Sequence, residues 1–262
     1  MRTNKLRSLL QSGQPTLGTR IHSPWPNVVE ALAHTGLYDY VEFLAEYASY
    51  TMHDLDNWCR AAEIYNLGTM IKVDQDTRMF AAQRAIGSGF ESVLFADSRT
   101  AEEVRECVRI ARPDTPEDGG LYGAATRRFA YMGYGGNAEY VQTLRDVVVA
   151  IMIEKKSAID QLDTILAVPG IDMIQWGPAD FSMSIGKPGE RRAPEVKAAE
   201  KQLIEACLSA GIPSRAEITS PDEAAYYLDM GVRHFSLNHD LNILYGWWKT
   251  NGEALRKRLE GK

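Results

Sequence analysis

Two acidic residues of this 262-residue chain follow strand-like apolar segments, where a carboxylate can serve a reaction. Glu154 comes directly after the apolar run of residues 147–153, so a charge arrives where a buried strand should end. Asp180 follows a second strand-like segment, after a Gly177–Pro178 pair that fixes a tight turn. Carboxylate oxygens are the ligands that hard divalent cations prefer. We therefore predict that Glu154 and Asp180 bind a divalent metal.

More polar residues fall where other strands are expected to end. They are His22, Glu46, Tyr47, Lys72, Asp74, Asp97, Glu217, His239 and Asp240. A ring of acids around one lysine and two histidines suits a divalent cation together with an anionic oxo substrate. An acid at such a position can also be a solvated loop residue or a helix cap, so the ring alone does not decide the chemistry.

The spacing of apolar residues predicts strands that alternate with helices. The predicted strands are residues 17–21, 38–44, 69–73, 92–95, 147–152, 173–176, 213–216 and 234–237. The predicted helices are residues 27–34, 54–64, 78–86, 101–110, 138–147, 195–210 and 221–230. Glycines such as Gly87, Gly89 and Gly211 are expected to end helices. This pattern favours an α/β fold in which residues 1–262 form a single (β/α)8 TIM barrel, whose active site lies at the carboxyl ends of the strands.

Two segments interrupt this alternation. Residues 113–136 are rich in glycine, arginine and aromatic residues, and residues 177–192 are expected to form an extended loop. In the first segment, Arg127 and Arg128 can hold a distal carboxylate or phosphate of a substrate; a subunit contact or a solvated turn is the alternative. Trp25, near the end of the first strand, is expected either to pack over the substrate or to seal the barrel rim.

The composition excludes several classes of protein. A formal net charge of −6 argues against a nucleic-acid partner, which would favour a basic surface. The chain has no apolar run of the ~20 residues that cross a bilayer, so we expect no membrane partner and a cytoplasmic location. Cys59, Cys107 and Cys207 are expected to be buried apolar side chains, because their number and spacing fit neither a disulfide framework nor a thiolate zinc site.

Residues 168–182, which read VPGIDMIQWGPADFS, resemble the V-x-G-I-D-x-x-x-x-G-P-A-D-L-S segment of the HpcH/HpaI aldolase family. Phe181 stands where the family has leucine. Residues 38–41, residues 153–154 and Asp240 are similar to the family's second strand, fifth strand and the acid near its eighth strand, so the resemblance covers most of the chain. It implies a (β/α)8 barrel, commonly hexameric, that uses a divalent metal to make or break a carbon–carbon bond next to a 2-oxo acid.

The resemblance also implies roles for individual residues. Glu154 and Asp180 match the family's two metal-binding carboxylates. Lys72 stands where the family usually has an arginine that contacts the oxo acid, and Tyr47 where it usually has the histidine implicated in proton transfer. Gly87 falls near an acid that typical members use. The metal pair is therefore intact, whereas the proton chemistry departs from the family.

The hypothesis we prefer is a divalent-metal-dependent carbon–carbon lyase, an aldolase that acts through a metal-stabilised enolate of a 2-oxo acid such as pyruvate, with an aldehyde as partner substrate. Mg²⁺ or Mn²⁺ is the expected cofactor, with Co²⁺ or Zn²⁺ as alternatives. The candidate catalytic residues are Lys72, Tyr47 and His22; a metal-bound water or His239 are alternatives for proton transfer. The candidate substrate-binding residues are Trp25, Arg127, Arg128, Trp176, Gly177, Pro178, Ala179, His239 and Asp240.

Other interpretations stay open at this point. The barrel can host another metal-assisted enolate lyase or a mutase, or it can be a non-catalytic relative that binds oxo acids. Lys72 can also form a Schiff base with a ketone if it loses its proton. The segment from about residue 241 includes an aromatic stretch at residues 244–248, which predicts a subunit interface or packing against its own barrel. The family resemblance favours a homo-oligomer, a hexamer or a trimer.

Overall fold

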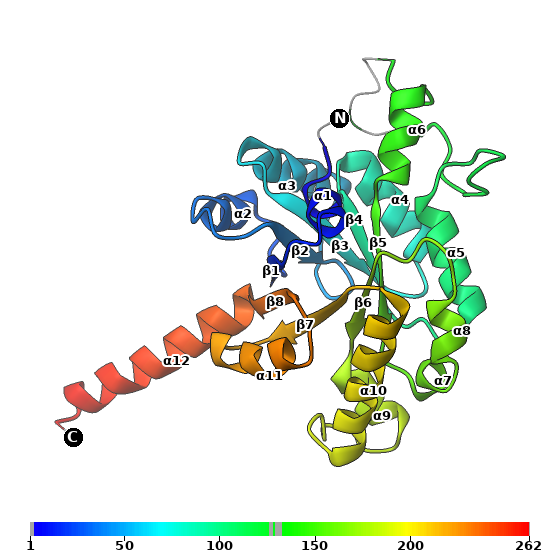
Figure 1. Ribbon diagram of the computed structural model, residues 1–262. Helices are drawn as coiled ribbons and strands as arrows, with labels where there is room; N and C mark the ends of the chain where they lie inside the picture. Colours follow the sequence, from blue (N-terminus) through cyan, green and yellow to red (C-terminus); the bar gives the residue numbers. More distant parts are fainter. Residues whose placement is uncertain (1–2, 126–127, 129–132, 262) are drawn as a thin grey trace.

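In the computed structural model, which describes residues 3–125, 128 and 133–261, eight parallel strands close into one barrel in chain order (Figure 1). The strands are β1 (Thr16–Ile21), β2 (Tyr40–Leu44), β3 (Gly68–Val73), β4 (Ser92–Phe95), β5 (Val148–Ile153), β6 (Met173–Trp176), β7 (Ser214–Ile218) and β8 (His234–His239). Helices surround this barrel, so the predicted (β/α)8 fold is confirmed.

Strand β5 shows why several strands read as continuous apolar runs. Successive side chains of a strand point to opposite faces, and both faces of this sheet are covered. Val148 and Ala150 point into the barrel and pack with Leu94, whereas Val149 and Ile151 pack in the layer between the sheet and the helices. The strand is therefore buried along its whole length, and it ends where Glu154 begins.

The helices follow the strands in the predicted order. They are α1 (Lys5–Gln11), α2 (Pro26–Ala33), α3 (Met52–Ile64), α4 (Arg78–Ser88), α5 (Ala101–Ala111), α6 (Ala138–Arg145), α7 (Lys156–Ile159), α8 (Leu162–Leu166), α9 (Pro178–Ser184), α10 (Pro194–Ala210), the 3-10 helix η2 (Pro221–Glu223), α11 (Ala224–Asp229) and α12 (Asp240–Leu259).

The structure corrects some local predictions. Residues 177–192 are not one extended loop, because α9 begins at Pro178, the favoured residue for a first helical position, directly after β6. Gly87 does not end α4; the helix runs to Ser88, and Gly89, with a left-handed φ of 119°, is its cap. Strand β7 continues to Ile218, so the predicted strand end at residue 216 is too early.

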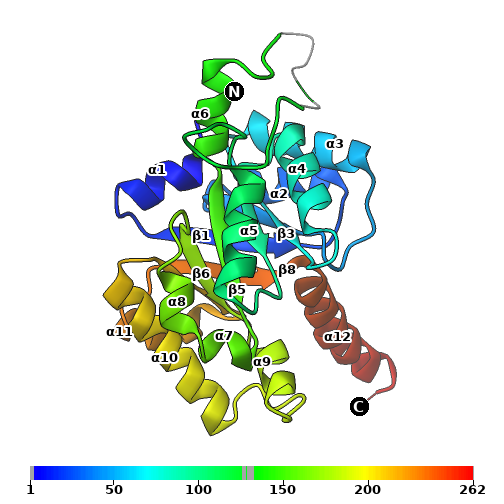
Figure 2. The same ribbon diagram turned by 90° about the vertical axis from the view of Figure 1, so that its right-hand side faces the viewer.

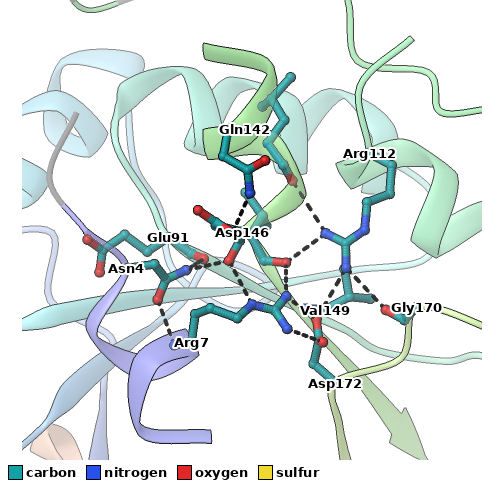
Figure 3. Close-up of polar contacts among 11 residues, drawn as sticks. Asn4, Arg7, Glu91, Arg112, Gln142, Asp146, Val149, Gly170 and Asp172 are labelled. Atoms are coloured by element: carbon teal, nitrogen blue, oxygen red, sulfur yellow. Dashed lines mark hydrogen bonds and ion pairs between the residues drawn. The ribbon is translucent and has the colours of Figure 1, made fainter. Parts of the chain in front are cut away.

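Helix α1, which the sequence analysis did not predict, closes the amino-terminal end of the barrel. Leu6 is fully buried and packs with the barrel-interior side chains Tyr40 and Met70. On the same helix, the Arg7 guanidinium donates to Asp172 Oδ2 at 2.6 Å and to the Val147 carbonyl at 2.8 Å (Figure 3).

Asp172, which lies in the motif of residues 168–182, is the centre of this contact. Besides the hydrogen bonds from Arg7, its carboxylate accepts hydrogen bonds from Nη2 of Arg112 at 3.3 Å and from the backbone N–H of Val149 at 2.8 Å. Figure 3 shows both arginines converging on this carboxylate. Because the amino-terminal end of a barrel is the stability face rather than the reaction face, this part of the motif serves the fold.

Helix α12 leaves the barrel and projects away from it, as both views show (Figure 1, Figure 2). Its residues 241–259 are all exposed. Trp247 and Trp248 are 64% and 61% exposed, and Leu244 and Tyr245 beside them are exposed as well. The alternative that this segment packs against its own barrel is therefore wrong for this arrangement.

The barrel interior also holds a buried ion pair. The Arg215 guanidinium on β7 donates to the carboxylate of Glu42 on β2, and both side chains are 0% exposed. Arg215 donates further to Gln175 Oε1 at 2.5 Å and to the Tyr40 hydroxyl at 3.1 Å. These partners satisfy a charge that would otherwise be very costly in a closed interior.

The three cysteines are fully buried and unbonded to one another, as predicted: Cys59, Cys107 and Cys207. Among the described residues, no helix combines the length and apolar character needed to span a bilayer.

Candidate active site

The carboxyl ends of the strands form one end of the barrel, which we call the mouth. Predicted residues from seven elements meet there: His22 after β1, Tyr47 after β2, Lys72 on β3, Glu154 after β5, Trp176 on β6, Asp180 on α9 and His239 on β8. The closed barrel explains this, because parallel strands all end on the same side.

Glu154 is the most enclosed acid of the mouth, with 2% exposure. Its Oε1 accepts the backbone N–H of Asp97 at 2.8 Å. Its Oε2 lies so close to Gly177 that a Cβ at that glycine would meet it at 2.6 Å. Burial raises the pKa of Glu154 to about 7; the positive charge of Lys72 opposes this rise, and the acids Asp180 and Asp97 add to it. The glycine of the Gly-Pro-Ala-Asp run is thus what allows this carboxylate to sit here.

Asp180 faces a lysine that the sequence analysis did not single out. Nζ of Lys155 lies 2.8 Å from Asp180 Oδ1 and 2.5 Å from Asp97 Oδ1. The side chain of Asp180 is 41% exposed, whereas that of Lys155 is 16% exposed. Burial alone would lower the pKa of Lys155, but its hydrogen bonds to Asp180 and Asp97 raise it.

Lys72 and Tyr47 form a pair on the neighbouring side of the mouth. The Lys72 ammonium donates to the Tyr47 hydroxyl at 2.9 Å, forms an ion pair with Glu46 Oε2 at 2.6 Å, and lies 4.8 Å from the Tyr47 ring centroid. Burial alone would lower the pKa of Lys72, but Tyr47 and Glu46 raise it overall. Burial of the phenol raises the pKa of Tyr47 to about 12, although the positive charge of Lys72 opposes this rise. Lys72 is therefore charged and Tyr47 protonated near neutral pH.

His22 and Asp240 lie together beside this pair. Asp240 Oδ1 is 3.2 Å from His22 Nδ1 and also accepts the backbone N–H of His22 at 3.0 Å, while Oδ2 accepts the N–H of Ser23 at 3.0 Å. The His22 ring is 6.2 Å from the Tyr47 ring, centroid to centroid. Asp240 therefore fixes the orientation of His22, with the ring next to Tyr47.

His239 is the third member of this group. Its ring lies 5.0 Å from that of His22, and its Nδ1 accepts the N–H of Asn242 at the start of α12. Burial, together with the charge of Arg20, lowers the pKa of His239. His22, His239 and Asp240 each have one atom that could ligate a metal ion, and these three atoms lie within 4.8 Å of one another. The ring of His239 is thus neutral near pH 7.

A cavity of about 360 Å³ adjoins the mouth and is lined in part by Trp176, Pro178 and His239. Trp176 packs against Phe181 with the ring centroids 4.7 Å apart, and its Nε1 has no hydrogen-bond partner among the described residues. Arg20, which also lines the cavity, is paired with Glu217 at 2.5 Å. The cavity thus offers polar groups from several strands to a small molecule.

The remaining predicted substrate residues lie in different places. Ala179 is in the first turn of α9 at the mouth, and Trp25, 61% exposed, precedes α2 on the rim. Arg128 is at the opposite end of the barrel, where its guanidinium bonds Glu63 Oε2 at 2.6 Å and the Ser88 carbonyl at 2.9 Å. The prediction that Arg128 reaches the substrate within its own barrel is therefore wrong. Arg127 lies outside the described residues.

Lys155 and Glu46 have contacts in the site that their sequence positions alone do not predict. The sequence contains one indication for each residue: Lys155 directly follows Glu154, and Glu46 directly precedes Tyr47. In both cases the contact depends on how far a long side chain reaches in the folded barrel, which spacing alone does not reveal.

Comparisons with known proteins identify the family of the chain. Residues 25–242 match the model of the HpcH/HpaI aldolase/citrate lyase family. The chain is 28% identical over 246 residues to a hydroxypyruvate/pyruvate aldolase of Paraburkholderia phytofirmans, covering 91% of this chain and 92% of the relative. It is 29% identical over 258 residues to a 2-keto-3-deoxy-L-rhamnonate aldolase of Escherichia coli, covering 98% and 92%.

Solved structures show the same fold. An HpcH/HpaI aldolase from Desulfitobacterium hafniense superimposes with a TM-score of 0.87 at 22% identity, covering 97% of this chain and 98% of that chain. A family protein from Burkholderia cenocepacia superimposes with a TM-score of 0.86 at 27% identity, covering 97% and 100%. The predicted resemblance and the predicted class of carbon–carbon lyase are thereby confirmed: the chain belongs to the HpcH/HpaI aldolase/citrate lyase family.

Proposed function

We propose that this protein is a divalent-metal-dependent aldolase that makes or breaks the carbon–carbon bond next to the carbonyl of a 2-oxo acid such as pyruvate, with an aldehyde as the other substrate. The observation that carries the proposal is the buried carboxylate of Glu154 at the mouth beside Asp180, with the charged Lys72 nearby. Relatives named as hydroxypyruvate/pyruvate and 2-keto-3-deoxy-L-rhamnonate aldolases support this substrate class.

The acids of the mouth fit a divalent cation. Among the described residues, Glu154 accepts one hydrogen bond, from the Asp97 N–H, which leaves Oε2 available. The negative charges of Asp180 and Asp97 disfavour its ionised form, and a bound cation would relieve this. Glu154 and Asp180 would hold the metal, and their oxygen atoms suit Mg²⁺ or Mn²⁺, with Co²⁺ or Zn²⁺ as alternatives. When bound, the metal supplies Lewis-acid polarisation of the oxo acid.

Lys72 supplies a fixed positive charge for the substrate. Because Glu46 and Tyr47 keep its ammonium protonated, Lys72 binds the carboxylate or the developing oxyanion rather than attacking the ketone as an amine. A lysine presents a point charge where an arginine would present two parallel N–H donors, so the substrate is held with less angular constraint.

Proton transfer falls to His22 in this proposal. The Tyr47 phenol, with a pKa near 12, is a poor base at neutral pH and instead donates or accepts a hydrogen bond. Asp240 accepts the Nδ1–H of His22, a tautomer that leaves Nε2 as the unprotonated nitrogen. An imidazole oriented in this way can take the proton from the 4-hydroxyl group of a 4-hydroxy-2-oxo acid as that group becomes the aldehyde carbonyl, and can return it to the aldehyde oxygen in the reverse direction.

The residues around the cavity complete the site. Trp176, Pro178 and His239 line it, and Gly177, Ala179 and Asp240 lie beside them in the chain. We assign these residues to substrate binding, and Trp25 to the rim that covers the bound molecule. The cavity of about 360 Å³ reaches the mouth at these residues, whereas Glu154, Asp180 and Lys72 are not part of its lining.

A direct assay tests the function. The purified protein is incubated with Mn²⁺ or Mg²⁺, pyruvate and a panel of aldehydes, and formation of 4-hydroxy-2-oxo acids is followed. We expect turnover that EDTA abolishes and that Glu154→Gln reduces at least about a hundredfold. Glu102→Gln, the same change at a side chain that is 84% exposed, serves as the control. Turnover that survives both EDTA and Glu154→Gln would contradict the proposal, and borohydride trapping would then test Lys72.

We also propose that the protein is a homo-oligomer. Helix α12 presents an uncovered apolar surface that includes Leu244, Tyr245, Trp247 and Trp248. Large exposed apolar surfaces of this kind mark protein interfaces, and a second copy of the chain is the occupant that the family resemblance favours. A hexamer or a trimer and a cytoplasmic location stay predictions.

A further inference from the structure

Lys155 is a charged group of the mouth that the proposed reaction does not use. It follows Glu154 in the chain, and its ammonium lies 2.8 Å from Asp180 Oδ1, a predicted metal ligand. Its side chain is 16% exposed, so most of its length is packed rather than extended into solvent. A positive charge of the protein itself therefore already neutralises one of the two carboxylates assigned to the metal.

We propose that Lys155 is an internal cation that competes with the divalent metal for Asp180 and thereby lowers the metal affinity of the site. A metal held by Glu154 and Asp180 would share Asp180 with the ammonium and would be repelled by it. Metal binding then requires Lys155 to release Asp180. This inference rests on the metal pair of the proposed function, but it does not depend on which reaction the metal serves.

Asp97 makes this exchange structurally simple. Its Oδ1 lies 2.5 Å from Nζ of Lys155, and its backbone N–H donates to Glu154 Oε1 at 2.8 Å. When Lys155 releases Asp180, it keeps Asp97 as its partner and is not left as an unpaired, partly buried charge. Asp97 thus holds both the lysine and the glutamate in place while Asp180 changes partner.

Manganese binding provides a test that is independent of turnover. The metal-free protein is titrated with Mn²⁺, and the free ion is measured from its electron paramagnetic resonance signal. Lys155→Met should bind Mn²⁺ about tenfold or more tightly than the wild type, because it removes the competing charge and keeps the side-chain length. Lys155→Arg keeps the charge and should bind as weakly as the wild type.

Lys156→Met is the matched control. Lys156 is the next residue, 57% exposed, and pairs with Asp160 at 2.7 Å, away from Asp180. Its replacement removes the same charge from the chain but should leave Mn²⁺ affinity unchanged within about twofold. A gain of equal size in Lys156→Met would show a general effect of net charge and would overturn the proposal.

A variant that combines Lys155→Met with Asp180→Asn tests whether the gain in Mn²⁺ affinity depends on Asp180. Asp180→Asn should remove the tighter binding of Lys155→Met, because the freed ligand is then absent. Equal or weaker binding by Lys155→Met, or a gain that persists without Asp180, would overturn the proposal. Lys155→Gln, with thermal unfolding measured alongside, gives the same decision if the methionine variant does not fold. Tighter Mn²⁺ binding in a protein without aldolase turnover would support this inference while contradicting the proposed reaction.

Discussion

The ammonium of Lys72 lies 2.9 Å from the phenol oxygen of Tyr47, and this contact joins two of the positions at which the sequence resemblance implies a departure from the family pattern. The lysine lies on β3, and the tyrosine follows β2, the strand paired with it. Glu46 completes the contact from the other side of the ammonium at 2.6 Å. The arrangement is a charged donor with two oxygen partners, not a base.

Tyr47→Phe should therefore be much less damaging than Lys72→Met. We expect kcat/KM to fall less than about tenfold in Tyr47→Phe and at least about a hundredfold in Lys72→Met. Because the pKa of Tyr47 is about 12, its phenol is protonated throughout pH 7 to 10. The wild type and Tyr47→Phe should therefore have the same dependence of kcat/KM on pH over that range. A basic limb of the wild-type profile that disappears in Tyr47→Phe would show that the phenol does titrate in the reaction.

Gly177→Ala should disrupt the metal pair. The added Cβ would meet Cβ of Glu154 at 2.5 Å and its Oε2 at 2.6 Å, which forces the carboxylate or the backbone to move. We expect Mn²⁺ affinity to fall by at least about tenfold and the protein to lose about 1–3 kcal/mol of stability. Gly123→Ala, where a Cβ would meet nothing within 4 Å, is the control. Wild-type Mn²⁺ affinity in Gly177→Ala would argue against Glu154 as a ligand.

The raised pKa of Glu154 predicts a pH-dependent loss of stability in the metal-free protein. Its pKa is about 7 when folded, against an ordinary value of 4.5. Between these values only the unfolded chain is ionised at this group, so the free energy of unfolding falls as the pH rises from about 4.5 to 7 and is constant above. The difference between the two pKa values corresponds to a fall of about 3 kcal/mol in the free energy of unfolding. Glu154→Gln should therefore be more stable than the wild type at pH 8 but not at pH 4.5.

Urea unfolding in EDTA at the two pH values measures this difference. Comparison of the two proteins at each pH cancels the contribution of groups that titrate in both. A stability difference that does not change between pH 4.5 and pH 8 would contradict the raised pKa. Saturating Mn²⁺ should stabilise the wild type more than Glu154→Gln, because the metal binds the ionised carboxylate.

Asp172→Asn should reduce stability rather than catalysis. The carboxylate pairs with Arg7 and Arg112, so its neutralisation leaves two partly buried guanidinium groups without their acid. We expect a loss of about 3–5 kcal/mol in the free energy of unfolding. Asp160→Asn, which breaks the exposed pair with Lys156, should cost at most about 0.5 kcal/mol. A loss of turnover in Asp172→Asn without destabilisation would place this residue in the reaction instead.

Charged residues on α12 should dissociate the proposed oligomer. Trp247→Glu together with Trp248→Glu places two negative charges on an apolar surface, and light scattering after size exclusion should show a smaller assembly than for the wild type. Lys257→Glu, near the end of the same helix, provides a control for charge on α12. A wild-type protein that is a monomer at micromolar concentration would contradict the proposal.

The fold and the position of Glu154 and Asp180 at the barrel mouth were predictable because local sequence patterns indicate both. The apolar run before Glu154 and the glycine and proline before Asp180 mark strand ends, and closure of the barrel brings all such ends to one side. No feature of that prediction requires knowing which side chains touch.

Long side chains were harder to place. Arg128 and Lys155 each reach an acid from a separate part of the chain, Glu63 for the first and Asp180 for the second. Their partners depend on the packing of loops against the barrel, which periodicity does not encode. Short helices such as α9 were missed for a related reason: one or two turns give too few residues for a helical period to be visible.

The pair of Arg215 and Glu42 restricts how this barrel can evolve. Both side chains are 0% exposed, so a mutation that neutralises one partner leaves the other charge buried without its counter-ion. Change at these positions must be correlated: descendants of this sequence should keep both charges or have lost both. A lineage that carries only one would need a compensating charge elsewhere inside the strands, which makes these two sites a marker for tracing the branch to which this chain belongs.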